Sequence, residues 1–270
     1  MQIPLLLLEF IYLANIAFLA AYGLNALVLA VMRRWRPKPP PVLEAGPGYD
    51  WPQVTVQLPV YNERYVVERL IKSVAALDYP RQRLQVQVLD DSTDVTSELI
   101  AKLTRSLQRK GLNIAHIQRP DRQGFKGGAL AHGMDSASGE FIAIFDADFL
   151  PPADFLKRTL PYFDLDPQTG CVQTRWGHIN RGSSLLTRAQ ANGIDGHFVI
   201  EQETRSQNDL FLNFNGTAGV WRRACIAEAG GWQHDTLTED LDLSYRAQLC
   251  GWKIQYLPHV TSPAELPAQV

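Results

Sequence analysis

The sequence has 270 residues, of which 46% are hydrophobic and 20% charged, with 26 basic against 28 acidic side chains. This composition excludes a disordered chain, a collagen-like repeat and a disulfide-dense miniprotein. A net charge of -2 also lacks the clustered basic excess of nucleic-acid-binding proteins, so we expect no nucleic-acid partner.

An apolar segment near the N-terminus predicts one transmembrane helix. Leu5–Met32 holds 28 residues and a single charge, Glu9. A helix of this length reaches about 42 Å, more than the ~30 Å of a hydrocarbon layer. The basic residues all follow this segment and none precedes it: Arg33, Arg34, Arg36 and Lys38.

The positive-inside rule therefore places the N-terminus outside and the remaining chain in the cytoplasm. A cleaved signal peptide is the alternative, but the basic leading region, the shorter apolar core and the A-x-A-like site that it needs are missing. We expect an integral protein of an inner, plasma or Golgi-type membrane.

The chain divides into three regions by composition. The membrane helix and its basic flank cover 1–36, a stiff linker with six prolines covers 37–52, and a soluble domain covers 53–270. The first 38 positions hold four basic residues and Glu9, so the remainder has 22 basic and 27 acidic residues, a net charge of -5. An anionic ligand of this domain would need local basic groups or a metal ion. The cysteines show no metal-ligand spacing and are expected to be buried free thiols: Cys171, Cys225 and Cys250.

Strand and helix patterns alternate through the soluble domain. We expect strands over 54–59, 85–89, 113–118 and 141–145, and helices over 64–77, 95–110 and 128–137. This order predicts an α/β fold with a central, mainly parallel sheet. Ligands of such sheets bind at the carboxyl ends of the strands.

Polar residues gather at those expected strand ends. The first strand runs into Tyr61-Asn62-Glu63, the second ends at Asp90-Asp91, and the fourth ends at Asp146-Ala147-Asp148. No G-x-G-x-x-G or Walker motif is present, so a dinucleotide oxidoreductase or a P-loop ATPase has no support.

The pair Asp146 and Asp148 is the strongest single signal. Residues i and i+2 of an extended segment face the same side, so the two carboxylates repel unless a hard divalent cation binds between them. The alternative is that they cap the next helix or occupy a turn before Pro151-Pro152.

Two further segments suit a nucleotide diphosphate. Asp90 or Asp91 would accept the imide N–H of a uracil, although an Asx turn explains an aspartate there equally well. In the 122–128 loop, glycines allow close backbone approach while Arg122 and Lys126 supply positive charge. A flexible basic loop is the alternative.

Thr238-Glu239-Asp240 opens an expected helix that ends near Cys250-Gly251. Thr236 and Glu239 match a capping box, which leaves Asp240 unexplained. A carboxylate held rigidly at a helix start suits a general base.

The glycine-rich turn over 214–219 suits the wall of a groove, or simply a structural loop. His197, Glu201 and Gln202 fall on one helical face, which a solvated or hydrogen-bonded helix explains as well.

Taken together, these motifs resemble glycosyltransferase family 2, and specifically its cellulose-synthase-like members, closest to the A and C groups with their glucomannan 4-β-mannosyltransferases and glucan synthases. The matching strings follow the family's order from about Val54 to the C-terminus: QLPVYNE (57–63), LDDSTD (89–94), RQGFKGGAL (122–130), FDADF (145–149), FNGTAGVWR (214–222) and TEDLDLSYRAQLCGW (238–252).

The resemblance implies a GT-A fold, a UDP-glucose or GDP-mannose donor, a Mg²⁺ or Mn²⁺ ion and inverting hexosyl transfer to a growing β-1,4-linked polysaccharide. It assigns the metal to Asp148 with Asp146, and catalysis to Asp240 in the T-E-D motif with Glu239. The other roles that it implies are nucleotide-sugar contacts for Glu63, Asp90, Asp91, Lys126 and Asp146, and the acceptor wall for Asn215, Gly216 and Thr217.

One motif of the family is missing. The Q-x-x-R-W segment and the C-terminal membrane helices do not occur up to Val270, so we expect a C-terminally truncated enzyme. Two other functions remain open: a single-addition transferase acting on a lipid acceptor, and an inactive membrane-bound scaffold.

Overall fold

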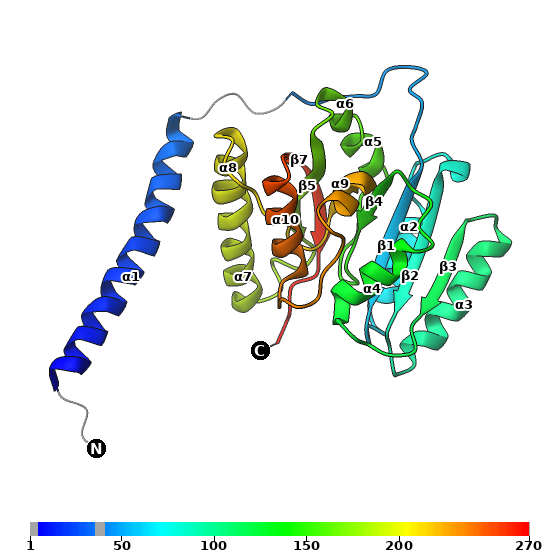
Figure 1. Cartoon of the computed structure of the whole chain (residues 1–270). Coiled ribbons are helices and arrows are strands. Elements are labelled where there is room, and N and C mark those ends of the chain that lie inside the picture. The colour runs from blue at the N-terminus through cyan, green and yellow to red at the C-terminus, as the bar shows by residue number, and fades with distance from the viewer. Residues whose placement is uncertain (1–4, 36–40, 270) are drawn as a thin grey trace.

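Alternating strands and helices build one mixed β-sheet (Figure 1). The computed structural model describes residues 5–35 and 41–269, except the side chains of Tyr22 and Trp35. Arg36 and Lys38 of the expected basic flank, the linker residues before 41, and Val270 lie outside the described residues. The expected α/β class is confirmed.

The sheet has the strand order β3-β2-β1-β4-β6-β5-β7 in the described part of the chain. Neighbouring strands are parallel except for β6, which runs antiparallel to both β4 and β5. The start of β6 therefore lies beside the end of β4, where Gly219 pairs with Ile144. The strands are β1 (Val54–Val60), β2 (Leu84–Asp90), β3 (Ile114–Gln118), β4 (Phe141–Ile144), β5 (Thr169–His178), β6 (Gly219–Arg222) and β7 (Lys253–Ala264).

Helices connect the strands and cover the sheet (Figure 1). They are α1 (Leu5–Met32), α2 (Val67–Ala75), α3 (Thr96–Arg109), α4 (Phe125–Met134), α5 (Phe155–Thr159), α6 (Tyr162–Leu165), α7 (Leu185–Gly196), α8 (Glu203–Gln207), α9 (Arg223–Glu228) and α10 (Glu239–Leu249), with short 3₁₀ turns η1 (Arg33–Trp35) and η2 (Arg81–Arg83). A π-helical turn, η3 (His197–Gln202), joins α7 to α8.

Both faces of the sheet are buried, and β4 shows how. Phe141 and Ala143 belong to the core cluster that contains α2 and α5, whereas Ile142 and Ile144 belong to the cluster that contains α4 and α10. Successive side chains of a strand point to opposite faces. A strand covered on both faces therefore needs the continuous apolar run that the sequence has there.

The expected element boundaries need two corrections. The helix expected over 64–77 begins only at Val67, because residues 61–66 turn at the end of β1. The helix expected over 128–137 spans Phe125–Met134 instead, and Gly124 precedes it with a φ of 72°. Lys126 therefore lies in the first turn of a helix and not in a loop.

The cysteine expectation also needs a correction. All three thiols are free, and Cys171 and Cys225 are buried as expected. Cys250 is exposed, because it follows the last turn of α10 at the surface.

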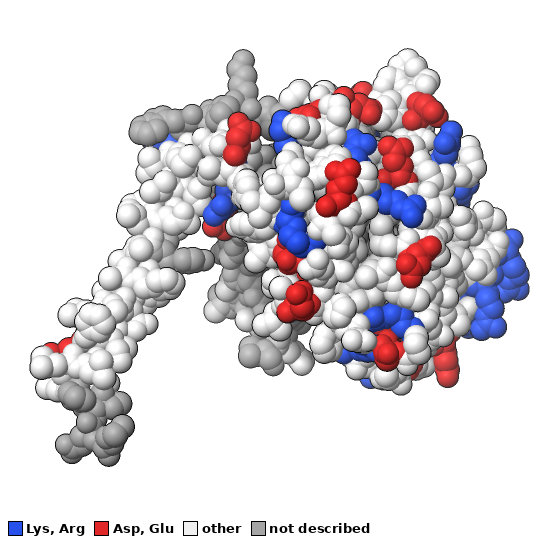
Figure 2. All heavy atoms as spheres, viewed as in Figure 1, with Lys and Arg blue, Asp and Glu red and all other residues white. Residues whose placement is uncertain are grey.

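Among residues 5–35 and 41–269, α1 is the one helix long and apolar enough to cross a membrane. It extends beside α7 and α8 (Figure 1), and Figure 2 shows its almost uncharged surface next to the mixed charges of the domain. Its C-terminal end touches the domain, where Leu29 is buried and Arg33 lies 3.5 Å from Glu203.

The described part of the linker lies against the domain. Residues 41–53 form no helix or strand, but the Tyr162 hydroxyl accepts a hydrogen bond from the Leu43 amide (3.2 Å) and donates one to the Pro41 carbonyl (2.7 Å). The Tyr49 hydroxyl donates to Asp164 (2.6 Å).

The close packing of α4 on the sheet predicts the effect of a single methyl group. A Cβ at Gly133 would lie 2.5 Å from Gln57 Nε2 and 2.9 Å from Leu89 Cδ2. We expect Gly133→Ala to lower the free energy of unfolding by about 1–3 kcal/mol through overpacking. Gly193→Ala on α7, where nothing lies within 4 Å, should instead raise it by about 0.5–1 kcal/mol. Urea unfolding of the detergent-solubilised chain tests both, and equal effects would contradict the packing of α4.

Candidate active site

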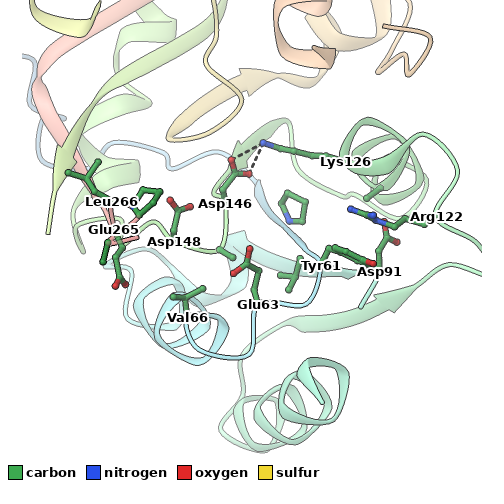
Figure 3. Close-up of a pocket in the computed structure, with 16 residues that line it drawn as sticks. Tyr61, Glu63, Val66, Asp91, Arg122, Lys126, Asp146, Asp148, Glu265 and Leu266 are labelled. Atoms are coloured by element: carbon green, nitrogen blue, oxygen red, sulfur yellow. Dashed lines mark hydrogen bonds and ion pairs between the residues drawn. The ribbon is translucent and has the colours of Figure 1, made fainter. Parts of the chain in front are cut away.

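A cavity of about 600 Å³ opens at the carboxyl ends of β1, β2 and β4 (Figure 3). The position follows the rule for parallel strands. Several residues singled out in the sequence line this cavity: Tyr61, Glu63, Asp91, Arg122, Lys126, Asp146 and Asp148. The segment 265–268 after β7 supplies a further wall, which no motif in the sequence indicated.

The Lys126 ammonium joins the two sides of the site. Its Nζ lies 2.6 and 2.9 Å from the two carboxylate oxygens of Asp146 and 3.8 Å from Glu239 Oε1, and it donates to the Gly216 carbonyl at 3.0 Å. Burial alone would lower the pKa of Lys126, but Asp146, Glu239 and Asp240 outweigh it and raise that pKa.

Gly216 separates Lys126 from Asp240. A Cβ on Gly216 would lie 3.1 Å from both Lys126 Nζ and Asp240 Oδ2, and its φ is 78°. Only a residue without a side chain fits there in a left-handed conformation. Asp240 thus reaches the same site as the Asp146 carboxylate, although it belongs to α10.

Glu63, Asp146 and Asp148 crowd negative charge into the cavity (Figure 3). Burial and the Asp148 and Asp146 charges raise the pKa of Glu63. Burial and Asp146 raise the pKa of Asp148. No group of three or more His, Cys, Asp or Glu residues with the arrangement of a metal site occurs in the described part of the chain. Two carboxylates are nevertheless enough for an ion that takes its other ligands from phosphates and water.

Asp90 and Asp91 have different surroundings. The Asp90 side chain is fully buried and accepts hydrogen bonds from the Ser92 amide (2.9 Å) and the Ser97 hydroxyl, with His116 Nε2 at 2.7 Å. Burial raises its pKa, but these hydrogen bonds outweigh burial and lower it. The alternative of an Asx turn therefore holds for Asp90, and only Asp91 lines the cavity.

Arg119 is a site residue that the sequence analysis missed. Its guanidinium binds both oxygens of Asp91, one of them at 2.9 Å, and donates to the carbonyls of Gln123 (2.8 Å) and Phe125 (3.0 Å). It thereby ties the end of β2 to the loop before α4. The signal was a basic residue directly after β3, the strand parallel to β2.

Arg122 stacks on an aromatic ring instead of entering the centre of the cavity. Its guanidinium carbon lies 3.3 Å from the ring centroid of Tyr61 and 5.0 Å from that of Phe125. In Figure 3, Tyr61, Arg122 and Asp91 occupy one end of the cavity, Lys126 and Asp146 the middle, and Asp148 with Glu265 the other end.

The Gln173 side chain holds the turn before β6 in place. This buried side chain accepts a hydrogen bond from the backbone amide of Asn215 (2.9 Å) and donates to the backbone carbonyls of Thr217 and Ala218 (both 3.2 Å). Thr217 Oγ1 accepts from the Asp146 backbone amide at 2.9 Å. The predicted acceptor residues therefore lie directly beside the predicted metal residues.

The predicted capping box is wrong. The N-cap of α10 is Thr238, not Thr236, and it makes no side-chain cap hydrogen bond. Glu239 points toward Lys126 instead, and burial raises its pKa. The attraction of the nearby Lys126 ammonium accounts for the direction of the Glu239 side chain.

Comparisons with known proteins show what the chain is similar to. A family model described as "Glycosyltransferase like family 2" matches residues 52–268. The chain is 43% identical over 269 residues to glucomannan 4-β-mannosyltransferase 1 of Oryza sativa subsp. japonica, covering 98% of this chain and 51% of the relative. It is 45% identical over 222 residues to glucomannan 4-β-mannosyltransferase 9 of Arabidopsis thaliana, covering 81% and 42%. The chain thus spans about half the length of the curated relatives it matches.

Solved structures share the fold. The mannosyltransferase PcManGT from Pyrobaculum calidifontis, in complex with GDP-Man and Mn²⁺, superposes with a TM-score of 0.74 at 26% identity, covering 94% of this chain and 68% of that one. TarS residues 1–349 of S. aureus, in complex with UDP-GlcNAc, give 0.60 at 20% identity, covering 81% and 60%. The GT-A fold expected from the sequence is confirmed.

The buried pair of Arg119 and Asp91 predicts a localised loss of order. We expect Arg119→Ala to lower the free energy of unfolding by about 3–5 kcal/mol, because it leaves the Asp91 charge buried without its partner. Amide hydrogen exchange should accelerate over residues 120–128. Arg105→Ala, which removes an exposed arginine bonded to its own helix, is the matched control. Equal exchange in the two variants would contradict the role of Arg119.

Proposed function

The chain belongs to glycosyltransferase family 2, and we propose that it transfers a hexose from a nucleotide sugar to a growing β-1,4-linked polysaccharide. The observation that carries the proposal is the contact of Lys126 with both Asp146 and the turn at Gly216, behind which Asp240 lies. A cation that can stabilise the leaving group, Lys126, and a candidate base, Asp240, thus lie on either side of Gly216.

The donor would lie along the cavity from Tyr61 to Asp148. A volume of about 600 Å³ is within the range of small-molecule sites. The Tyr61 ring and the Arg122 guanidinium offer a stacking surface for a base, and the Asp91 carboxylate keeps lone pairs free to accept a base N–H. We propose GDP-mannose as the donor, because the relatives are named mannosyltransferases, with UDP-glucose as the competitor.

The carboxylates fit a divalent cation, Mg²⁺ or Mn²⁺. Asp148 and Asp146 would hold it, since their mutual repulsion is what raises the pKa of Asp148 beyond the effect of burial. A bound cation would offset the charge of the donor diphosphate.

Two side chains would carry out the proton transfer and stabilise the leaving group. Asp240 takes the proton of an acceptor hydroxyl as its oxygen forms a bond to the anomeric carbon. The bond from that carbon to the diphosphate oxygen breaks, and the electron pair leaves with the diphosphate beside the Lys126 ammonium. Attack opposite the leaving group inverts the configuration, through an oxocarbenium-like transition state.

The proposed setting is a membrane. If α1 spans the bilayer, the positive-inside rule applied to Arg33 and Arg34 favours a cytoplasmic catalytic domain and an N-terminus outside. Asp146 and Asp240 would then use the cytoplasmic pool of nucleotide sugar. A lipid acceptor and an inactive scaffold are the outcomes that the following experiments distinguish.

Loss of the Asp240 base should stop transfer without stopping donor binding. We expect Asp240→Asn to lower kcat by about 10²–10⁴-fold in membranes that contain the protein. Asp235→Asn, an exposed carboxylate of the preceding loop, is the control and should retain activity. Transfer from radiolabelled GDP-mannose and UDP-glucose to polysaccharide and to lipid extracts is measured. Equal inactivity of the parent and the mutant would support the scaffold, and label in the lipid fraction alone would support the lipid acceptor.

Removal of the metal should also lower the rate of sugar transfer. We expect a chelator to abolish transfer and Mn²⁺ or Mg²⁺ to restore it, while Asp148→Asn shifts the metal concentration for half-maximal activity upward by about 10–100-fold. Asp154→Asn, an exposed aspartate at the start of α5, should leave that concentration unchanged. Full activity in the presence of chelator would contradict the assignment of Asp148 and Asp146.

A further inference from the structure

The π-helical turn η3 interrupts the path from α7 to α8. It covers His197–Gln202. Such turns are rare and occur frequently at functional sites. His197, Glu201 and Gln202 all lie in this turn, and the proposed reaction uses none of them.

The π-turn directs two side chains at one loop. His197 Nε2 lies 2.9 Å from Asn215 Oδ1, and Gln202 Nε2 donates to the Asn213 carbonyl at 2.7 Å. In an α-helix, residues five apart point about 140° away from each other. The i to i+5 hydrogen bonding of a π-helix brings them to one face. The irregular turn is therefore what allows both contacts with the segment before Gly216.

The partners of Asn215 fix how its amide is oriented. Its Nδ2 donates to the Asn213 carbonyl at 3.2 Å, so its Oδ1 faces His197 Nε2. Because an amide oxygen and a carboxylate only accept, both nitrogens of the His197 ring carry a proton when it bonds to Asn215 and Glu201 together. The other ring nitrogen, Nδ1, lies 2.8 Å from Glu201 Oε2. A carboxylate bound to one nitrogen sets the orientation of a histidine ring.

We propose that His197, oriented by Glu201, is a positioning residue that holds the Asn215 amide ready to bind a sugar hydroxyl of the acceptor. This inference rests on the proposed function, because it takes the acceptor to lie on the Asp240 side of Gly216. After its contacts with His197 and Asn213, the amide of Asn215 keeps one N–H and one carbonyl lone pair for a hydroxyl.

The exposure of the pair agrees with a role at an open groove. The side chains of His197 and Glu201 are 33% and 36% exposed, so they lie at an edge of the molecule that solvent reaches. Asn215 follows Phe214, which is buried against Trp221, so the backbone on that side is fixed by packing. The orientation of the Asn215 amide is what remains for the histidine to set.

The test separates acceptor binding from donor binding. In membranes that transfer the sugar to a soluble β-1,4-linked oligosaccharide, we expect His197→Ala to raise the KM for the oligosaccharide about tenfold, since one hydrogen bond is lost. The KM for the nucleotide sugar should stay within about twofold, because none of the residues at the donor end changes. His197→Gln, whose amide can still donate to Asn215, should recover part of the loss. His132→Ala on α4, where the imidazole pairs only loosely with Asp135 (3.8 Å), is the control and should change neither constant.

A double variant tests whether His197 acts through Asn215. Combined with Asn215→Ala, the histidine substitution should add no further increase in the KM for the oligosaccharide. Additive increases, or equal increases of the two KM values, would overturn the proposal. If the parent protein transfers the sugar but His197→Ala leaves the KM for the oligosaccharide unchanged, this inference alone is overturned. If the parent protein transfers no sugar, the proposed function is overturned as well.

Discussion

One ammonium group holds the site together. Carboxylates that follow β1 and β4 line the cavity, and Glu239 of α10 lies beside it. Like charges this close together in a partly buried site repel strongly. Lys126 offsets that repulsion with direct contacts to Asp146 and a longer one to Glu239. Its position in the first turn of α4 is fixed by the packing of that helix on the sheet, which is so close at Gly133 that a side chain there would not fit. The electrostatics of the site thus depend on a contact in the core.

The antiparallel strand gives the site its second half. A purely parallel sheet would gather only residues that follow strands at this edge. Because β6 runs against β4, the residues that precede it lie beside those that follow β4, and the Ala218 amide donates to the Ile144 carbonyl at 2.9 Å. The turn at Gly216 therefore meets Asp146, although the two are far apart in the chain. The residues proposed to bind the donor and those proposed to bind the acceptor thus become neighbours because one strand runs in the opposite direction.

The sequence predicted the α/β order, the apolar β4 and the carboxylates at the strand ends, because each of these leaves a local pattern. From the residues alone it left the turn before β6 open between the wall of a groove and a structural loop, and it assigned that turn to the acceptor only through resemblance to a family. It could not distinguish Asp90 from Asp91, since that difference depends on His116 and Arg119, which come from another strand and the loop after it. The capping box was predicted wrongly for the same reason, because Glu239 lies near the ammonium of Lys126, a residue far away in the sequence. Contacts between elements decided each case that the pattern left open.

The π-helical turn also fixes the spacing of the chain. His197 and Gln202 reach one loop only because an extra residue widens the helix there. Inserting a further residue into this turn, or removing one from α7 or α8, would rotate everything after that point by about 100°. The stretch from α7 to α8 should therefore accept exchanges of side chains more readily than changes in length, and in an engineered enzyme this is a place to substitute residues and not to insert or delete them.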